Sequence, residues 1–212
     1  SESRGSNSYQ TRTNVSLDVT YRPIDRLKIS LEPYFGINQN RIQYVTTEQY
    51  QGQDQYFLAE INQKTLMVEF RIDFSLTPDL SIQYYGQPFV SSGTYSNYKW
   101  VTNPKAKNYE DRFVLIQPDV DNHLNLDGMD DSDVELPDPD FKFIYFQSNM
   151  VLRWEYLPGS TVYVVWSQSR DEGEYELDQL PFNLNDDMNR MLRIFPHDVF
   201  LLKLSYRIPI NG

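Results

Sequence analysis

The stretch Leu66–Leu76, LMVEFRIDFSL, decides the fold class of this chain. Every second residue in it is apolar, namely Leu66, Val68, Phe70, Ile72, Phe74 and Leu76. The residues between them include Glu69, Arg71 and Asp73. Successive side chains of a β-strand point to opposite faces of the sheet, so a period of two residues is that of a strand. The stretch therefore predicts a strand with one apolar face and one ionic face.

Six further segments repeat this period, and helical spacing fits none of them. They are residues 15–21, 27–37, 80–89, 146–156, 161–168 and 200–208. Residues 185–195 are the exception, and their sequence predicts a short helix inside a loop. The sequence therefore predicts an all-β fold built from seven antiparallel strands.

Short and long connections alternate strictly between these strands. The short connections, residues 22–26, 77–79 and 157–160, each combine Pro with Asp or Gly, which is turn chemistry. The long connections are residues 38–64, 90–141 and 170–197. Outer-membrane barrels have short periplasmic turns and long extracellular loops. The pattern thus favours an integral antiparallel transmembrane β-barrel in an outer membrane, with its apolar face on lipid and its charged face in the lumen.

The composition excludes several other classes of protein and site. A net charge of −11 argues against a nucleic-acid partner, which requires a basic face. The chain has no cysteine and two histidines, which excludes disulfides, thiolate metal sites and histidine-rich zinc sites. No run of 18 apolar residues predicts a transmembrane helix, and the first ten residues lack a signal-peptide pattern.

The odd strand count bears on the organisation of the domain. Bacterial single-chain barrels have an even number of strands, whereas seven are predicted here. We therefore interpret residues 1–212 as the carboxyl-terminal portion of one larger barrel, completed by upstream strands of the same polypeptide. An unpaired strand edge in hydrocarbon is costly, so residues 15–21 and 200–208 are each expected to pair on one side with a strand outside this numbering.

Two segments resemble a known family. They are MVLRWEYLPGSTVYVVWSQSR, Met150–Arg170, and DVFLLKLSYRI, Asp198–Ile208. They are similar to the carboxyl-terminal region of a family of unknown function in Gram-negative outer membranes. Members of that family join an amino-terminal carbohydrate-binding-family-9-like domain to a carboxyl-terminal barrel. The resemblance implies a sugar-binding domain upstream, and it assigns no sugar-binding residue to this chain.

An acidic segment, residues 119–140, is the most conspicuous local feature. It holds nine carboxylates, and flexible loops rich in carboxylate and amide oxygens bind calcium. HLNLDG, residues 123–128, partly matches an EF-hand loop, so the candidate calcium ligands are Asp121, Asn125 and Asp127. His123 stands where an EF-hand has its first Asp, and Val134 where it has its bidentate Glu. The alternative is a solvated surface loop.

No motif predicts catalysis. The chain lacks a G-x-S-x-G elbow and a Gly-rich phosphate loop, and carboxylate pairs such as Glu172/Glu174 and Asp186/Asp187 are ordinary in acidic loops. The charges on the lumen face are expected to form cross-strand ion pairs or to line a pore. Trp100 lies in a long connection, where it is placed to meet a ligand or to pack within the loop.

The predicted function is therefore non-enzymatic. The barrel would act as a channel, or as a subunit of an outer-membrane complex that docks partners through its long loops. The first alternative is a membrane-anchored carbohydrate-binding or carbohydrate-processing protein whose active domain lies upstream. The second is a soluble β-sandwich binding module.

Overall fold

The computed structural model describes residues 2–4, 9–119, 122–126, 134–172 and 182–208. Strands account for most of these residues, and α1 (Leu184–Arg193) is the one α-helix among them. The predicted all-β class is confirmed. None of the helical residues described forms a helix that is both long and apolar enough to cross a membrane.

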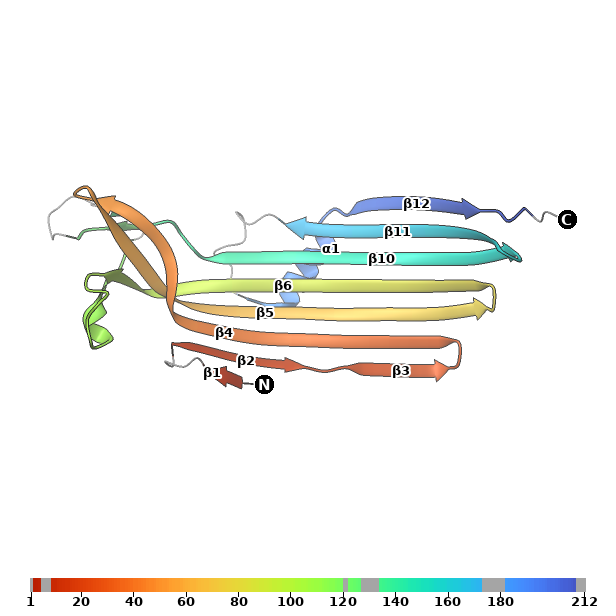
Figure 1. Ribbon diagram of the computed structural model, residues 1–212, viewed down its shortest axis with the longest axis horizontal. Coiled ribbons are helices and arrows are strands. Elements are labelled where there is room, and N and C mark those ends of the chain that lie inside the picture. The colour runs from red at the N-terminus through yellow and green to blue at the C-terminus, as the bar shows by residue number, and fades with distance from the viewer. Residues whose placement is uncertain (1, 5–8, 120–121, 127–133, 173–181, 209–212) are drawn as a thin grey trace. The chain divides into compact units, whose positions relative to one another are not determined.

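The described strands form one large antiparallel sheet and a small hairpin (Figure 1). The large sheet has the order β1-β2-β4-β5-β6-β10-β11-β12, with β3 paired to β4 and β7 paired to β6. Its neighbours follow chain order, so it is a meander. The bounds are β1 Glu2–Arg4, β2 Gln10–Ser16, β3 Val19–Ile24, β4 Leu27–Tyr50, β5 Gln53–Thr77, β6 Leu80–Val101, β7 Phe113–Leu115, β10 Phe141–Leu157, β11 Ser160–Glu172 and β12 His197–Ser205, with β8 His123–Leu124 and β9 Val134–Glu135 forming the hairpin.

Five of the seven predicted segments lie wholly in strands, whereas residues 15–21 are divided between the end of β2 and β3, and residues 200–208 extend beyond the end of β12 at Ser205. The three short connections are also confirmed, because β3 and β4, β5 and β6, and β10 and β11 are each separated by two residues. Gly159 in the last of these turns has φ 80°, a left-handed conformation that glycine adopts without a steric penalty.

The predicted long loop at residues 38–64 is wrong. β4 continues to Tyr50 and β5 begins at Gln53, so the connection is the two-residue turn Gln51–Gly52. Both turn residues have positive φ, 51° and 76°, as a type I′ hairpin turn requires. Residues 38–64 are largely polar, so hydropathy does not alternate there, yet backbone hydrogen bonds pair the strands regardless of side chain. Periodicity therefore could not detect this extension.

The predicted loop at residues 90–141 is wrong in its first part, because β6 continues to Val101. A short 3-10 helix (Glu110–Arg112), β7, β8 and β9 lie in the remainder. The third connection, residues 170–197, contains α1, which confirms the helix predicted near residues 185–195.

The chain divides into two compact units. We call residues 1–14, 36–64 and 92–141 the hairpin unit, and residues 15–35, 65–91 and 142–212 the turn unit, because the short turns belong to it. The core of the hairpin unit contains the buried side chains of Phe57, Leu124, Val134 and Leu136. The core of the turn unit contains Val90, Ile144 and Met191, so it is built between the sheet and α1.

The strands β3 and β12 pair with the neighbours that the sequence predicted for them. β3 pairs with β4, as in Val19 opposite Leu31, and β12 pairs with β11 from Thr161 opposite Ser205 to Gln168 opposite Asp198. In the ranges that the structure describes, β3 and β12 are not paired with each other. Completion of these edges by strands outside the numbering stays a prediction.

Candidate functional site

One face of the turn unit carries apolar side chains in registered rows. On β10, β11 and β12, Leu152 lies opposite Val164, and Val164 lies opposite Leu202. Opposite residues of an antiparallel pair point to the same face of the sheet. The neighbouring rows on this face are Met150–Trp166–Phe200 and Trp154–Val162–Leu204. The predicted apolar faces of these three strands therefore form one continuous surface.

This apolar face continues onto the other strands of the turn unit. On β3 and β4, Tyr21 lies opposite Ile29. On β5 and β6, the ring of Phe70 lies where a side chain at Gly86 would stand, and it packs against Tyr84. The alternation read from Leu66–Leu76 thus corresponds to an apolar face of the sheet.

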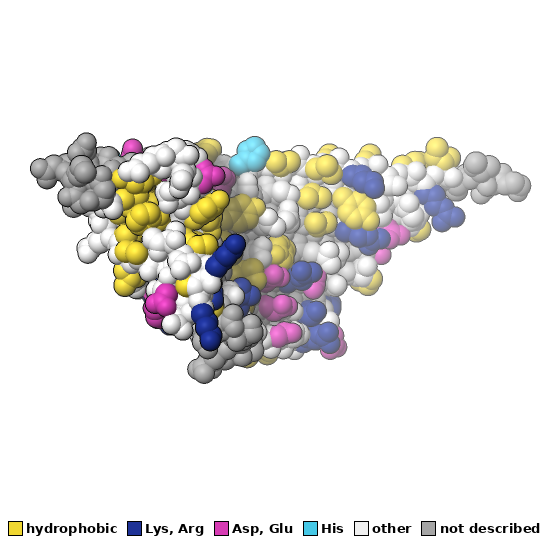
Figure 2. Space-filling view, turned by 60° about the vertical axis from the view of Figure 1, so that its left-hand side comes forward, with side chains coloured by type: hydrophobic (Ala, Val, Ile, Leu, Met, Phe, Trp, Pro, Cys, Tyr) yellow, Lys and Arg dark blue, Asp and Glu magenta, His cyan; other side chains and the backbone are white. Residues whose placement is uncertain are grey.

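Many side chains on this face are exposed. Phe200 and Leu202 are each 72% exposed, and Tyr21 is 61% exposed. Figure 2, which is turned by 60° from the view of Figure 1, shows hydrophobic side chains (yellow) at the surface and a group of charged side chains with some hydrophobic ones among them. A contiguous exposed apolar surface marks contact with protein, ligand or membrane.

The apolar face ends at the row formed by Trp166 of β11 and Phe200 of β12. The Trp166 ring stacks on Phe200, with centroids 6.2 Å apart, and its Nε1–H donates to Oδ1 of Asp198 at 2.8 Å. The next row on the same face is polar, with Ser148 opposite Gln168 and Gln168 opposite Asp198. An aromatic ring with its polar edge at the end of an apolar surface is typical of a membrane–water boundary.

The opposite face of the turn unit is mixed, with polar rows beside the apolar row Val151–Val165–Leu201. Arg153, Tyr163 and Lys203 lie opposite one another in a row, with the Lys203 ammonium 5.9 Å from the Tyr163 ring centroid. Residues Arg71, Asp73, Gln83, Tyr85, Gln147 and Asn149 help to line a cavity of about 380 Å³. The charged residues that were predicted to face the lumen have partners of different kinds. Arg153 pairs with Glu155 of its own strand at 2.8 Å, whereas Asp73 accepts from Gln83.

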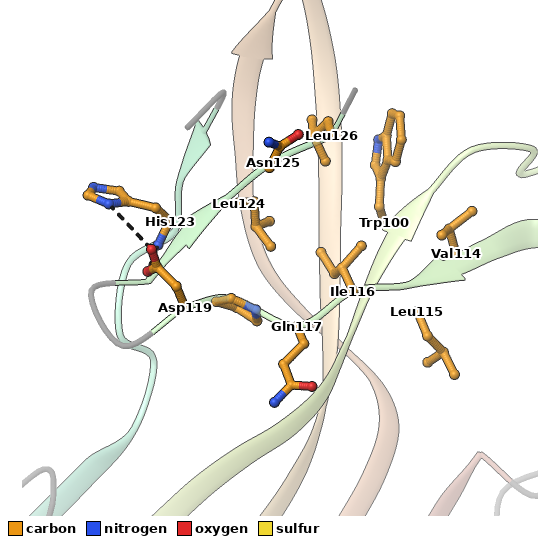
Figure 3. A pocket seen from close by; sticks show the side chains of 11 residues that line it. Trp100, Val114, Leu115, Ile116, Gln117, Asp119, His123, Leu124, Asn125 and Leu126 are labelled. Atoms are coloured by element: carbon orange, nitrogen blue, oxygen red, sulfur yellow. Dashed lines mark hydrogen bonds and ion pairs between the residues drawn. The ribbon is translucent and has the colours of Figure 1, made fainter. Parts of the chain in front are cut away.

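The hairpin unit contains a larger cavity, of about 700 Å³ (Figure 3). Apolar residues of β6, β7 and the β8 segment line it, together with a polar edge that includes Asp119 and His123. Asp119 accepts the backbone N–H of His123 at 2.8 Å and lies 4.0 Å from its ring. Trp100 lies on β6, not in a loop, and its Nε1–H donates to Gln55 at 2.9 Å. Trp100 therefore has a structural contact as well as a place in the cavity wall.

The calcium prediction is only partly covered by the described residues. Asp121 and Asp127 lie outside them, and Asn125 is an exposed residue in the wall of the 700 Å³ cavity. Within the ranges that the structure describes, no group of three His, Asp or Glu side chains is arranged to hold a metal ion. Calcium binding by the acidic segment stays a prediction.

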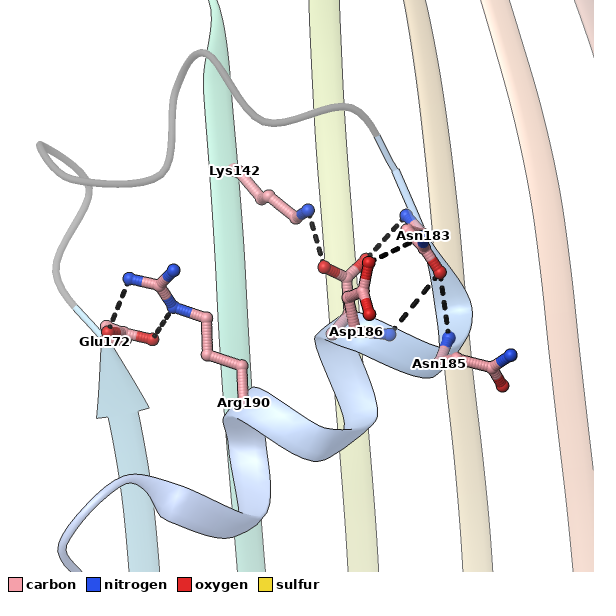
Figure 4. A network of polar contacts seen from close by, with 7 residues as sticks. Lys142, Glu172, Asn183, Asn185, Asp186 and Arg190 are labelled. Carbon is pink, nitrogen blue, oxygen red and sulfur yellow. Dashed lines mark hydrogen bonds and ion pairs between the residues drawn. The ribbon is translucent and has the colours of Figure 1, made fainter.

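A network of ion pairs and hydrogen bonds holds α1 against strands β10 and β11 (Figure 4). Lys142 of β10 pairs with Asp187 of α1 at 2.5 Å, and both side chains are almost completely buried. Arg190 donates two hydrogen bonds to Glu172 of β11, at 2.7 and 2.9 Å. Asn183 caps the helix by accepting the N–H groups of Asn185 and Asp186. Residues of this network, among them Lys142, Glu172 and Arg190, line a cavity of about 530 Å³.

This network accounts for most of the carboxylates considered for catalysis. Glu172 and Asp187 are ion-paired, and Asp186 accepts a hydrogen bond from the Asn183 side chain at 2.7 Å. Glu174 lies outside the described residues. The three described carboxylates thus have partners that hold α1 in place.

Two buried lysines were not identified from the sequence. Lys99 donates to the Glu60 carboxylate at 3.1 Å and to the backbone oxygen of Arg41 at 2.7 Å. Lys142 stands inside the aromatic run FKFIYF, residues 141–146. A lysine within an apolar run is the signal that could have identified Lys142, because such a charge must find a partner when it is buried. Lys99 has no comparable signal.

Burial and neighbouring charges shift the pKa values of Glu60 and Tyr98 in the hairpin unit. Burial alone would raise the pKa of Glu60, but hydrogen bonds from Asn97 and Lys99 and the charges of Lys99 and Arg41 lower it below its ordinary value of 4.5. Burial, with the nearby carboxylates of Asp140 and Asp138, raises the pKa of Tyr98 to about 12. The protonation of these two groups in the hairpin unit therefore depends on their burial and on neighbouring charges.

Comparison with curated proteins and with solved structures returns no match. The resemblance of Met150–Arg170 and Asp198–Ile208 to a family of unknown function is confirmed at that level, and the match extends well beyond these two segments. Residues 2–212 match the family described as "Domain of unknown function (DUF5916)", and the chain belongs to that family.

Proposed function

We propose that this chain forms part of an integral β-barrel of a Gram-negative outer membrane and serves as a subunit of a surface complex, docking partners through its hairpin unit. The observation that carries the proposal is the set of registered apolar rows on β10, β11 and β12, exposed on one face, with Arg153, Tyr163 and Lys203 on the other. Strands of a membrane barrel alternate in this way between lipid and lumen.

The turns support one orientation in the membrane. The two-residue connections after β3, β5 and β10 all belong to the turn unit, and short turns are periplasmic in bacterial barrels. The strands β4 and β5 have 24 and 25 residues, far more than the roughly 9–11 that cross a bilayer. We assign the surplus to hairpins on the extracellular side.

The edges of the sheet require partners in this setting. An unpaired row of N–H and C=O groups in hydrocarbon costs several kcal/mol per group. We propose that further strands of the same polypeptide pair with the outer edges of β3 and β12 and complete the barrel. The resemblance of Met150–Arg170 implies a carbohydrate-binding domain upstream, and we propose that any carbohydrate ligand binds that domain.

The hairpin unit supports a docking role. Val114 and Leu115 of β7 are 47% and 72% exposed and line the cavity of about 700 Å³. Exposed apolar side chains beside a preformed cavity fit a partner surface. The carboxylates of Glu172 and Asp187 are ion-paired, which supports a non-enzymatic role.

Membrane extraction tests the barrel. Outer membranes holding the full-length protein are washed with carbonate and urea and then treated with detergent. We expect the protein to stay in the pellet until detergent is added. Release by the washes alone would overturn the barrel and favour the soluble β-sandwich.

The docking role is tested with the double variant Val114→Asp/Leu115→Asp. We expect loss of the outer-membrane complex on native gels, with the barrel still inserted. Asn103→Asp/Lys105→Asp, at two exposed residues of the same unit, is the control and should keep the complex. An unchanged complex in the β7 variant would contradict docking through this surface.

A channel is the second candidate, favoured by the polar face with its cavity of about 380 Å³ between Arg71, Asp73 and Gln147. Charged side chains that line a pore set its ion selectivity. Planar-bilayer recordings separate the two roles. Stable conductance altered by Arg71→Gln favours the channel, whereas a silent barrel favours the docking subunit.

A further inference from the structure

One edge of β3 is uncovered among the described strands. β3 pairs with β4 on one side, as in Val19 opposite Leu31, and no strand that the structure describes pairs with its other side. Val19, Tyr21 and Ile24 on this strand are between 41% and 61% exposed. A free row of backbone N–H and C=O groups beside apolar side chains is a template for pairing with another strand. This edge is therefore a binding surface for one further strand.

The short strand β1 already covers the preceding part of this edge (Figure 1). β1 runs antiparallel to β2, with Glu2 opposite Thr13 and Arg4 opposite Thr11, so the numbers of two opposite residues add up to 15. β1 has three residues, and β2 continues beyond it towards β3. Because the two strands are antiparallel, the chain upstream of Glu2 leaves β1 in the direction of β3.

β2 and β3 keep a single register against β4. The backbone N–H groups of Arg41 and Leu17 donate to the carbonyl oxygens of Tyr9 and Pro33 at 2.8 and 3.1 Å. In both pairs, and in the ladder of β3 with β4 as far as Tyr21, the numbers of the two partners add up to 50. The gap between β2 and β3 therefore inserts no extra residue, unlike a β-bulge. A strand that pairs with β2 can continue along β3 without a change of register.

We propose that the segment directly upstream of Ser1 extends β1 into a full strand and pairs with this edge. With the β1–β2 register kept, the first residue before Ser1 lies opposite Val15, the fifth opposite Val19 and the seventh opposite Tyr21. The order of the large sheet supports this choice, because its neighbouring strands follow chain order. The segment also closes no loop, so its pairing avoids the entropic cost that a distant segment would bear. The inference rests on the proposed completion of the barrel and names the strand that provides it on this side.

The register predicts the hydropathy of the upstream segment. Val15, Leu17, Val19 and Tyr21 form one apolar face, and opposite residues of an antiparallel pair point to the same face. We therefore expect apolar residues at the first, third, fifth and seventh positions before Ser1, with polar residues between them. A helical period or a uniformly polar run at these positions would overturn the proposal.

Disulfide trapping in the full-length protein tests the register directly. Residues 1–212 contain no cysteine, and any upstream cysteine is first replaced by serine. Val19→Cys is combined with a cysteine at the fifth residue before Ser1, which gives the matched pair, or at the third, which gives the offset pair. Opposite Cα atoms lie about 4.5–5.5 Å apart, within the reach of a disulfide, whereas diagonal partners lie about 7–8 Å apart.

The disulfides are formed by oxidation of outer membranes and quantified by mass spectrometry of the unreduced digest. We expect about fivefold more disulfide in the matched pair than in the offset pair, because only the matched pair meets the distance requirement. Ser3→Cys/Arg12→Cys, opposite each other in the β1–β2 ladder, is the positive control. Absence of its disulfide would remove the β1 register and overturn the proposal.

The remaining outcomes separate this inference from the proposed function. Equal yields in the matched and offset pairs, or a disulfide that joins two copies of the chain, would show another occupant of the edge and overturn the proposal. If the protein stays in carbonate- and urea-washed membranes without the matched disulfide, the barrel stands and the strand assignment fails. A matched disulfide in protein that the washes release would uphold the strand and overturn the barrel.

Discussion

The Lys142–Asp187 pair is the clearest single-residue constraint in the turn unit, since both side chains are almost fully buried. Removing one partner of a buried ion pair leaves an uncompensated charge, which costs about 3–5 kcal/mol. We expect Asp187→Ala to lower the unfolding free energy by about that amount, measured by urea unfolding in detergent. The control Asp186→Ala, at an exposed neighbour, should cost less than about 1 kcal/mol.

A double variant distinguishes lost charge from lost packing. In Lys142→Met/Asp187→Leu neither charge remains, and such replacements are often neutral or stabilising. We expect its unfolding free energy to lie well above that of Asp187→Ala. If the double variant were as unstable as the single one, the pair would contribute chiefly through shape.

The Glu60–Lys99 pair predicts acid sensitivity of the hairpin unit. The pKa of Glu60 is lowered in the folded state from 4.5, so its stabilising contribution is present above pH 4.5 and is lost as pH falls through the lower folded value. We therefore expect the unfolding free energy of the wild type to fall more between pH 6 and pH 3 than that of Glu60→Gln. The difference between two denaturation series measures this, and equal pH dependence would contradict it.

At the scale of the element, α1 depends on its amino-terminal cap. The Asn183 side chain accepts the N–H groups of Asn185 and Asp186 at 3.2 and 3.4 Å. Loss of such a cap costs about 1 kcal/mol, so Asn183→Ala should speed amide exchange in residues 184–193 about fivefold. Asn189→Ala, at an exposed position within the helix, is the control and should leave exchange unchanged or slower. Equal exchange in both variants would show that tertiary contacts alone hold the helix.

At the scale of the whole molecule, Leu201 and Leu202 distinguish the two faces of the sheet. They are adjacent leucines on β12, and their partners are Val165 and Val164, so they point to opposite faces. Arginine on the lipid side of a barrel costs about 2–4 kcal/mol near the bilayer centre and less towards its surface. We expect Leu202→Arg to reduce outer-membrane assembly strongly, measured by heat-modifiable gel mobility, and Leu201→Arg to be tolerated. The reverse order would place lipid on the polar face.

The sequence by itself determined the strands, the turns and the two faces of the turn unit. In Leu66–Leu76 hydropathy alternates because one face is apolar, and Pro–Gly at residues 158–159 sets a tight turn locally. Such signals lie within a few neighbouring residues. The same reasoning predicted the helix near residues 185–195, although not the surface on which it packs.

Only the tertiary structure decided what lies in residues 38–64, where polar strands pair without any hydropathy pattern. Only it brought Lys99 to Glu60 and Lys142 to Asp187, across 39 and 45 positions of the chain respectively. It also placed α1 on the apolar face of the sheet, where Met191 packs with Ile144 and Val90. The physical reason is that hydrogen bonds between strands and the partner of a buried charge depend on which distant residues meet in space, and a local pattern carries no record of that meeting.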